Sequence, residues 1–333
     1  MLRGLKARHE RWPLSRPFRI SRGEKTAADV VVVEARAGDH VGQGESVPYA
    51  RYGESIESVL AQVSALGPAF ENGLTRLELQ DALPPGAARN AMDCALWDLE
   101  AKLKGCSVAE LIGAQSPAEM VTAVTISLDA PELMADAAAR VADAPLIKVK
   151  VNGDAPLESI AAVRRAAPSA RLIVDPNESW NAALLAEMLA PLANLGVALI
   201  EQPLPADGDH ALEHIASPIP ICADESAHVS ADLARVARRY RAVNIKLDKT
   251  GGLTEALATR RQAEDMGLIV MVGCMISTSL GIAPALHVAA NAQFVDLDGP
   301  WWLLQDRDSA VRFSSGRLAP PRNGWGISSR RIA

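Results

Sequence analysis

The pattern of apolar and polar residues changes once along the chain, near residue 118. Before that point, a β-branched run over residues 30–36, a Gly-Asp turn and a second run over residues 41–46 predict strands over residues 1 to about 53. Apolar residues then recur at helical spacing over residues 88–103. Gly105 is expected to end that helix, and Ser107 with Glu110 predicts a capped short helix. Residues 1–117 are therefore expected to form an α+β domain, with strands first and helices second.

From residue 118 to about 309, short apolar strands alternate with Ala-rich helices. We expect eight strands, over residues 121–127, 146–150, 172–175, 198–201, 219–223, 242–246, 268–272 and 294–298. Their ends recur at intervals of roughly 25 residues, about the length of one strand–loop–helix unit. Because the eighth helix is irregular in sequence, we predict an α/β fold with a modified TIM (β/α)7β-type barrel. The α+β domain would cap this barrel, and residues from about 310 to 333 would complete the cap.

Composition and charge exclude several classes of protein. Lys and Arg number 34 and Asp and Glu number 40, so the formal net charge of −6 does not favour nucleic acid as a partner. No apolar run approaches the roughly 18 residues of a membrane helix, and the first residues lack the apolar core of a secretory signal. The 4 cysteines are scattered, without the spacing of a zinc motif or a disulfide framework. We expect a cytoplasmic protein without a membrane partner, and whether it forms a homo-oligomer stays open.

Ionisable residues recur at the carboxyl ends of the expected barrel strands, where barrel proteins place their functional residues. They are Lys148, Lys150, Asp175, Glu201, Asp224, Lys246, Asp296 and Asp298. The rest of each strand is apolar, and buried charge is costly unless it is paired or binds something. This recurrence is the most specific signal in the sequence.

Three acids, Asp175, Glu201 and Asp224, end three consecutive strands. Neighbouring strands lie about 4.8 Å apart, so the three carboxylates can converge. They would repel one another unless a cation joined them, and an all-oxygen site favours Mg²⁺, with Mn²⁺ as a substitute. The alternative is that each acid caps the helix after it. Because the acids recur in three consecutive units, we favour the metal site.

Three lysines are expected to point into the same mouth of the barrel. Lys148 and Lys150 are two residues apart on one strand, so they share a face. Lys246 lies four strands further on, half of an eight-stranded ring, and should face Lys150. Two bases on opposite faces of one carbon are what a racemase or epimerase needs. The alternative, that the lysines only neutralise the acids, fits Lys148 best.

The free pKa of a lysine, about 10.4, must fall for it to act as a base near neutral pH. A nearby Mg²⁺ and a second ammonium group would lower it. Lys249 lies beyond the strand and is expected to pack outside the site.

Asp296 and Asp298 are also two residues apart and share a face. Their strand lies half a ring from the strand of Glu201, so a cationic group of a substrate would sit opposite the metal. A substrate with an ammonium at one end and a carboxylate at the other is an amino acid or a short peptide. The alternative is that residues 298–300 form a plain turn.

Five motifs follow these strands: Lys148-Val-Lys150, Val174-Asp-Pro-Asn-Glu-Ser-Trp180, Glu201-Gln-Pro203, Ala223-Asp-Glu-Ser226 and Asn244-Ile-Lys-Leu-Asp-Lys-Thr-Gly-Gly252. With them the chain resembles the enolase superfamily, in its muconate-lactonising subgroup. Asp296-Leu-Asp298-Gly-Pro300 is similar to the dipeptide epimerases, specifically those that act on L-Ala-D/L-Glu. The resemblance runs the whole chain. Pro176, where relatives often have Ala, departs from the pattern but leaves the ligands untouched.

The resemblance implies a role for each of these residues. One Mg²⁺ per subunit would be held by Asp175, Glu201 and Asp224 and would stabilise an enediolate, while Lys150 and Lys246 exchange the α-proton. Substrate would contact Thr125, Lys148, Cys274 and Ile276, its ammonium would bind Asp296 and Asp298, and Asn177 and Glu225 would support the site from behind. Arg22, in a loop of the capping domain, is expected to pair bidentately with the glutamate side-chain carboxylate of the substrate.

The resemblance and the residues together predict a Mg²⁺-dependent epimerase of L-Ala-D/L-Glu, which works by two-base 1,1-proton transfer and serves murein peptide recycling. Alternatives on the same fold are a cycloisomerase, an o-succinylbenzoate synthase or an epimerase of other dipeptides. A metal-free Schiff-base aldolase that uses Lys150 or Lys246, and a non-catalytic sugar- or peptide-binding barrel, are two further hypotheses.

Overall fold

Three antiparallel strands form the first sheet, in the order β1 (Arg3–Ile20), β2 (Gly23–Ala37) and β3 (His40–Ser46). The computed structural model describes residues 2–326. The β-branched run predicted as a strand is the buried part of β2. Alternate residues of β2 pack into two hydrophobic cores. Val31 and Val33 pack with the N-terminal helices, while Val30 and Val32 pack with the barrel. The central strand thus joins the two halves of the molecule.

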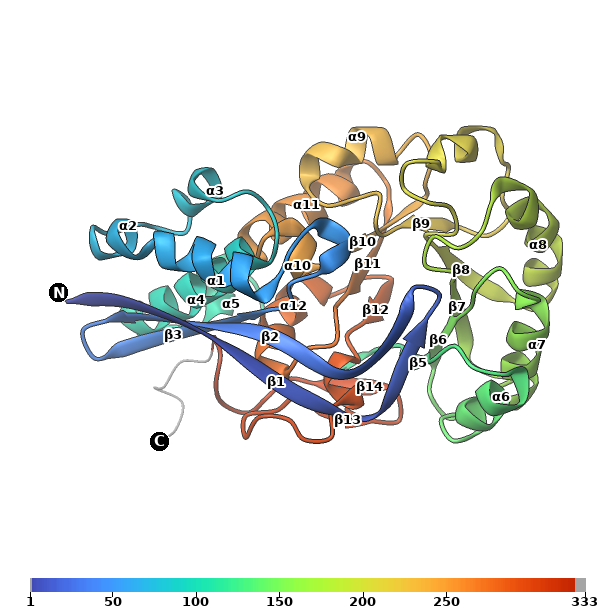
Figure 1. The fold of residues 1–333 in the computed structure, drawn as a ribbon, viewed down its shortest axis with the longest axis horizontal. Coiled ribbons are helices and arrows are strands. Elements are labelled where there is room, and N and C mark those ends of the chain that lie inside the picture. The colour runs from blue at the N-terminus through green and yellow to red at the C-terminus, as the bar shows by residue number, and fades with distance from the viewer. Residues whose placement is uncertain (1, 327–333) are drawn as a thin grey trace.

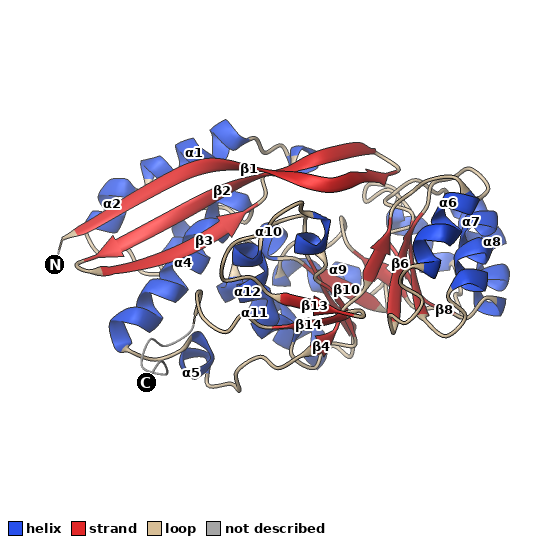
Figure 2. Ribbon diagram, turned by 90° about the horizontal axis from the view of Figure 1, so that it is seen from below, coloured by secondary structure: helices blue, strands red, loops and turns tan. Residues whose placement is uncertain are grey.

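Helices cover one face of this sheet (Figure 2). The helices of this domain are η1 (Ala50–Tyr52), α1 (Ile56–Ala65), α2 (Gly67–Glu71), α3 (Leu79–Ala82), α4 (Ala87–Lys104) and α5 (Val108–Ile112), and α1, α2 and α4 are those that pack on the sheet. Gly105 ends α4 in the left-handed conformation and Ser107 forms a capping box with Glu110, so both predictions are confirmed. The β3 strand lies so close to α4 that a Cβ on Gly44 would come within 2.1 Å of the Ala91 carbonyl oxygen. Only glycine allows this approach.

Eight parallel strands form the barrel, as predicted (Figure 1). They are β5 (Val124–Ile126), β6 (Leu146–Lys150), β7 (Arg171–Asp175), β8 (Val197–Glu201), β9 (Ile221–Ala223), β10 (Ala242–Ile245), β11 (Ile269–Gly273) and β12 (Phe294–Asp296). Each pairs with its neighbour in chain order, and the Ala123 amide donates to the Val295 carbonyl at 2.8 Å where the ring closes. The α/β barrel with an N-terminal antiparallel sheet domain is therefore confirmed.

Several predicted strand boundaries differ from the structure by one to three residues, and the first and last strands show the reason. Residues before β5 form β4 (Met120–Val121), which pairs with β14 (Arg317–Ala319) outside the barrel, and β14 in turn pairs with β13 (Arg312–Ser314). At the other end, Asp298 lies beyond β12 and precedes the short 3-10 helix η4 (Gly299–Trp302). Apolar residues continue past the ends of both strands, so periodicity alone could not separate strand from connection.

The barrel helices are less uniform than the sequence pattern predicts. Full helices follow most strands: α6 (Pro131–Ala139), α7 (Pro156–Ala166), α8 (Ala182–Asn194), α11 (Leu253–Asp265) and α12 (Ser279–Ala289). After β8 there is only the 3-10 helix η2 (Asp209–His214), after β9 come η3 (Ser230–Asp232) and α9 (Leu233–Val236), and α10 (Leu247–Thr250) precedes α11. Within residues 2–326, no helix combines the length and apolar character needed to cross a bilayer.

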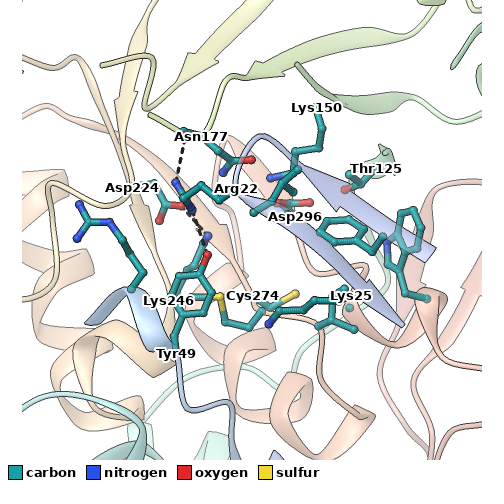
Figure 3. Close-up of a pocket in the computed structure, with 18 of the residues that line it drawn as sticks. Arg22, Lys25, Tyr49, Thr125, Lys150, Asn177, Asp224, Lys246, Cys274 and Asp296 are labelled. Atoms are coloured by element: carbon teal, nitrogen blue, oxygen red, sulfur yellow. Dashed lines mark hydrogen bonds and ion pairs between the residues drawn. The ribbon is translucent and has the colours of Figure 1, made fainter. Parts of the chain in front are cut away.

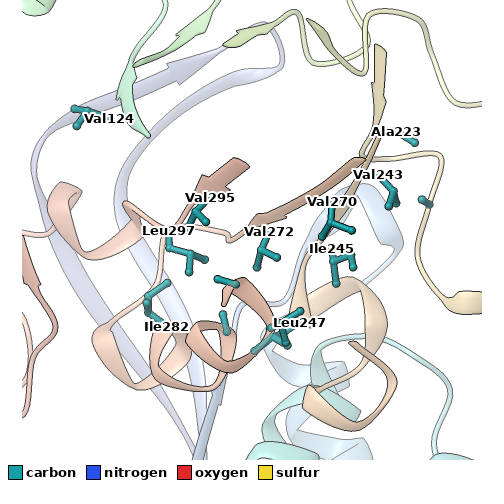
Figure 4. Close-up of a cluster of buried hydrophobic side chains, with 14 of the residues drawn as sticks. Val124, Ala223, Val243, Ile245, Leu247, Val270, Val272, Ile282, Val295 and Leu297 are labelled. Carbon is teal, nitrogen blue, oxygen red and sulfur yellow. The ribbon is translucent and has the colours of Figure 1, made fainter. Parts of the chain in front are cut away.

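Side-chain alternation along the barrel strands separates two environments. Outward residues such as Val243, Val270 and Val272 pack against the surrounding helices (Figure 4). Inward residues toward the amino ends of the strands, such as Ile173 and Leu199, form a small apolar cluster that fills the barrel interior. Charged side chains follow at the next inward positions, so an apolar layer lies beneath the charged mouth of the barrel.

The hairpin of β1 and β2 reaches over that mouth (Figure 2). Near its tip, Arg19 exchanges hydrogen bonds with the barrel: its amide donates to the Ser127 hydroxyl at 2.6 Å, and its carbonyl accepts from the Leu128 amide at 3.1 Å. The Ser21 hydroxyl and the Arg22 guanidinium both donate to the Asn177 carbonyl oxygen. The N-terminal domain therefore forms one wall of any site at the mouth.

The end of the described chain also contacts the N-terminal domain. The Trp325 indole donates to the Cys94 carbonyl at 3.1 Å, and the Gly326 amide donates to Asp98 Oδ1 at 3.0 Å. The Val108 amide donates to the Gly326 carbonyl at 2.9 Å. The part of the prediction that concerns residues 327–333 lies outside the described residues.

We predict that His287 makes the protein sensitive to acid. Its ring stands 5.8 Å from the ring of Trp325, and burial lowers its pKa to about 4. An unfolded chain would bind a proton near pH 6.5, so the free energy of unfolding falls as pH drops from about 6.5 toward 4, by about 2 kcal/mol at pH 5. His287→Gln should flatten this part of the curve, measured by urea unfolding at pH 7 and pH 5. An unchanged slope would contradict the prediction.

Candidate active site at the barrel mouth

A cavity of about 390 Å³ lies between the carboxyl ends of the barrel strands and the N-terminal domain (Figure 3). Twelve of the residues predicted for the site line it: Arg22, Thr125, Lys148, Lys150, Asn177, Asp224, Glu225, Lys246, Cys274, Ile276, Asp296 and Asp298. The other two, Asp175 and Glu201, are fully buried and lie behind Lys148, which contacts both. The structure therefore brings the whole predicted set together.

Lys148 joins acids from three different strands. Its Nζ lies 3.0 Å from Asp175 Oδ2, 2.7 Å from Glu201 Oε2 and 2.8 Å from Asp296 Oδ2. Burial lowers the pKa of this lysine, but the attraction of Asp296, Glu201 and Asp175 outweighs burial and raises it well above its ordinary value. Lys148 is therefore a permanent cation, and it neutralises the acids as the sequence alternative anticipated.

Lys150 and Lys246 enter the cavity from strands four apart in the ring. Lys150 Nζ donates to Asp175 Oδ2 at 2.5 Å, and Lys246, directly after β10, donates to Asp224 Oδ2 at 2.6 Å. Burial opposes the charge of Lys246, but Asp224 and Glu201 raise its pKa above the ordinary value. In this arrangement Lys246 is a proton donor.

The three predicted metal ligands are close enough to affect one another. Burial, followed by repulsion from Asp175, raises the pKa of Glu201 to about 7. Glu201 Oε1 accepts from Asn244 Nδ2 at 2.8 Å, whereas its buried Oε2 has an ion pair with Lys148 but no aligned hydrogen bond. Among the described residues, no three His, Cys, Asp or Glu side chains stand as a ready-made metal cluster. Lysine ammonium groups instead contact one oxygen each of Asp175 and Glu201 and both oxygens of Asp224.

Lys249 belongs to this site, although the sequence analysis placed it outside. Its fully buried Nζ donates to Asp224 Oδ1 at 2.6 Å, to the Asp224 carbonyl at 2.5 Å and to the Asn244 carbonyl at 2.9 Å. The reason is local: α10 begins directly after Lys246, and residues three apart on a helical turn lie on one side. The Lys-Leu-Asp-Lys spacing could have shown this had a helical turn been predicted there.

The two acids after β12 differ in their bonding. Asp298 Oδ2 accepts from the Thr125 amide at 2.8 Å, and burial, with repulsion from Asp296, raises the pKa of Asp298 to about 6. Asp296 Oδ2 is paired with Lys148, but its Oδ1 is buried without a hydrogen bond among the described residues. An unsatisfied buried acceptor is costly, so this oxygen is suited to a donor from a ligand.

Arg22 is engaged by the protein itself. Its Nη2 donates to Glu225 Oε1 at 2.7 Å and to the Tyr49 hydroxyl at 3.1 Å, and its Nη1 donates to the Asn177 carbonyl at 2.9 Å and to Glu178 Oε2 at 3.1 Å. Four acceptors thus share one guanidinium. Pairing of Arg22 with a substrate carboxylate would require these bonds to break.

Comparison with known proteins matches both halves of the chain. Residues 2–113 match the N-terminal domain of mandelate racemase / muconate lactonizing enzyme, and residues 132–333 match the enolase C-terminal domain-like family. The chain is 50% identical to the L-Ala-D/L-Glu epimerase of Escherichia coli, over 95% of this chain and 99% of that protein. It is 44% identical to an N-acetyl-D-glutamate racemase of Pseudoalteromonas, over 89% of this chain and 95% of that protein.

A solved structure shares the fold closely. It is an enolase family member from Agrobacterium tumefaciens with homology to dipeptide epimerases, with bound sodium and L-Ala-L-Glu. The TM-score is 0.95 and the identity 51%, over 96% of this chain and 98% of that one. The chain therefore belongs to the enolase superfamily, in its mandelate racemase / muconate lactonizing enzyme branch. It is an enzyme of the isomerase class.

We predict that Lys148→Met destabilises the protein, because it leaves three carboxylates without their shared cation. Removing one partner of a buried ion pair costs about 3 kcal/mol or more. Urea unfolding at pH 8 in the presence of a chelator measures the loss. Lys104→Met, at an exposed ion pair, is the control and should change the unfolding free energy little. Equal stability of the two variants would contradict the role given to Lys148.

Proposed function

We propose that the enzyme interconverts L-Ala-L-Glu and L-Ala-D-Glu by two-base 1,1-proton transfer. The observation that carries this proposal is the placement of Lys150 and Lys246, which reach one cavity from strands half a ring apart. A substrate α-carbon bound between them has one amine on each face. One lysine can remove the α-proton, and the other can return a proton to the opposite face. A single base, or two bases on one flank, would not invert the centre.

The protonation states of the lysines at the site support these roles. Lys246 is held protonated by Asp224 and Glu201, so it can act as the acid on its face. It becomes a base only when another cation takes over the neutralisation of those carboxylates. Lys148 keeps its proton, and its fixed positive charge can stabilise negative charge on the substrate without exchanging a proton.

The acids fit a divalent metal. Asp175, Glu201 and Asp224 supply only oxygen donors, which suits Mg²⁺, and the buried Glu201 Oε2 has the Lys148 ammonium 2.7 Å away but no aligned hydrogen bond. Burial raises the pKa of Glu201 most, and repulsion from Asp175 and Asp224 adds to the shift, so a bound cation would favour the ionised carboxylate. We therefore assign one Mg²⁺ to these three residues. When bound, it supplies Lewis-acid stabilisation of the charge that develops as the α-proton leaves.

The acids on the opposite side favour a dipeptide over other substrates of related enzymes. Asp296 Oδ1 lacks a donor, and Asp298 lies beside it, so an ammonium group satisfies both. The substrates of cycloisomerases and o-succinylbenzoate synthases offer no ammonium, and neither does an N-acylated amino acid. The proposal extends to murein peptide metabolism in the cytoplasm, which the sequence resemblance implies.

We predict that Lys150→Ala and Lys246→Ala each abolish epimerisation, while each keeps α-proton exchange with one stereoisomer. In D₂O, one variant should label only L-Ala-L-Glu and the other only L-Ala-D-Glu, as followed by mass spectrometry and NMR. Lys104→Ala is the control and should epimerise at the wild-type rate. Epimerisation at that rate by either site variant would show that the two-base mechanism is wrong.

Asp298→Asn should weaken dipeptide binding far more than metal binding. The amide keeps an oxygen for the Thr125 amide but loses the charge that faces an ammonium. A hydrogen bond to a charged group contributes about 1.5–3 kcal/mol, so KM for L-Ala-L-Glu should rise roughly 10- to 100-fold. Calorimetric titration with Mg²⁺ should give nearly the wild-type affinity. Equal losses in the two measurements would remove Asp298 from the substrate site.

A further inference from the structure

We propose that Asn90 of helix α4 is a positioning residue for Lys246 and acts through its hydrogen bond to Asp248. This inference rests on the proposed function and adds to it the group that keeps one of the two amines in place beside the substrate α-carbon. Asn90 belongs to the N-terminal domain and is not among the residues that line the cavity. It therefore acts only through the barrel segment that it holds.

The backbone supports the two amines in different ways. Lys150 is the last residue of β6, which lies between β5 and β7, and it is still in register with Asp175 of β7. Lys246 lies one residue past the end of β10, directly before the four-residue helix α10. A site residue outside the strand ladder needs support from the segment that follows it. The position of Lys246 therefore depends on how α10 is held.

Asp248 fixes the near end of α10 against the N-terminal domain. Its Oδ1 accepts from Asn90 Nδ2 at 2.8 Å and from the Val47 amide at 2.9 Å. Asn90, Asp248 and Val47 are all buried, so the loss of one of these bonds leaves a polar group unsatisfied. Because Asp248 comes only two residues after Lys246, a shift of its carboxylate moves the backbone that carries the amine.

Further contacts with α4 fix the far end of α10. Arg89 Nη2 donates to the Thr250 carbonyl at 2.7 Å. Asp93 Oδ2 accepts from the Thr254 amide at 2.9 Å, at the start of the next helix. The two segments approach so closely that a Cβ on Gly252 would lie 2.5 Å from the Cβ of Asp93. Helix α10 thus packs beside α4 (Figure 1), and the hydrogen bond to Asp248 decides where its near end lies.

The strand that carries Lys150 has no such support from the N-terminal domain. Within the described residues 2–326, no hydrogen bond or ion pair joins residues 146–150 to residues 2–113. Loss of the bond between Asn90 and Asp248 should therefore displace one amine and leave the other in place. A displacement of about 1 Å at a reacting group can lower a rate roughly 100-fold.

The test measures α-proton exchange of L-Ala-L-Glu and of L-Ala-D-Glu separately, as initial rates of deuterium uptake in D₂O with Mg²⁺. Lys246→Ala identifies the isomer whose exchange depends on Lys246. Asn90→Leu keeps a similar branched shape but has no donor. In this variant, exchange of that isomer should fall roughly 10- to 100-fold, and exchange of the other isomer should change less than about threefold.

Three further variants separate the hydrogen bond from the shape of the side chain. Asn90→Ser, whose hydroxyl is too short to reach the carboxylate, should give the same imbalance between the two exchange rates. Asp248→Leu should do so as well, because it removes the acceptor. Asp248→Asn keeps an oxygen acceptor and should stay near the wild-type ratio of the two rates.

Met92→Ala is the control for a loss of stability alone. Met92 is buried on the same helix but packs in the core of the N-terminal domain, so its truncation should lower the free energy of unfolding and leave the ratio of exchange rates unchanged. An equal loss of both exchanges in Asn90→Leu and Asn90→Ser, or no loss in either, would overturn the inference and leave the proposed function standing. If the wild-type enzyme exchanges the α-proton of neither isomer, the proposed function fails, and this inference fails with it.

Discussion

Charge compensation inside the barrel mouth is the constraint on which the site depends. Four lysines and six acids are buried there: Lys148, Lys150, Lys246 and Lys249 with Asp175, Glu201, Asp224, Glu225, Asp296 and Asp298. Every lysine of this set pairs with an acid, yet the acids outnumber the lysines and some of their oxygens lack a hydrogen bond. Arg22 compensates one of these acids, Glu225, and the incompletely bonded oxygens of the others are where a divalent cation and a substrate ammonium can bind.

The N-terminal domain adds a wall to this charged mouth. The apolar cluster inside the barrel offers no polar partner to the charged side chains above it, and the β1–β2 hairpin lies over the opening. Arg22 holds the hairpin to the barrel through Glu225 and the Asn177 carbonyl. The ionisable groups of the site therefore come from the strand ends, while the hairpin of the N-terminal domain forms one of its walls.

Much of this arrangement could be predicted from the sequence, because barrel strands alternate strictly between inward and outward residues. Ionisable residues spaced at strand ends, such as Lys150 and Asp175, had to meet at one mouth, and they do. The sequence pattern could not show which charged side chains form ion pairs with one another. Lys249 entered the site through a helical turn that was not predicted, and the acceptors of Arg22 come from segments more than 20 residues distant in the chain. These partners depend on how the two domains pack against each other, and a local sequence pattern does not reveal that packing.

A crystal structure of the enzyme with Mn²⁺ and L-Ala-L-Glu would test the central claim most directly. Anomalous scattering would locate the ion, and the density of the dipeptide would fix its α-carbon. We predict that Asp175, Glu201 and Asp224 coordinate the ion and that the amines of Lys150 and Lys246 stand on opposite faces of that carbon. An ion bound elsewhere, or two amines on the same face, would contradict the account.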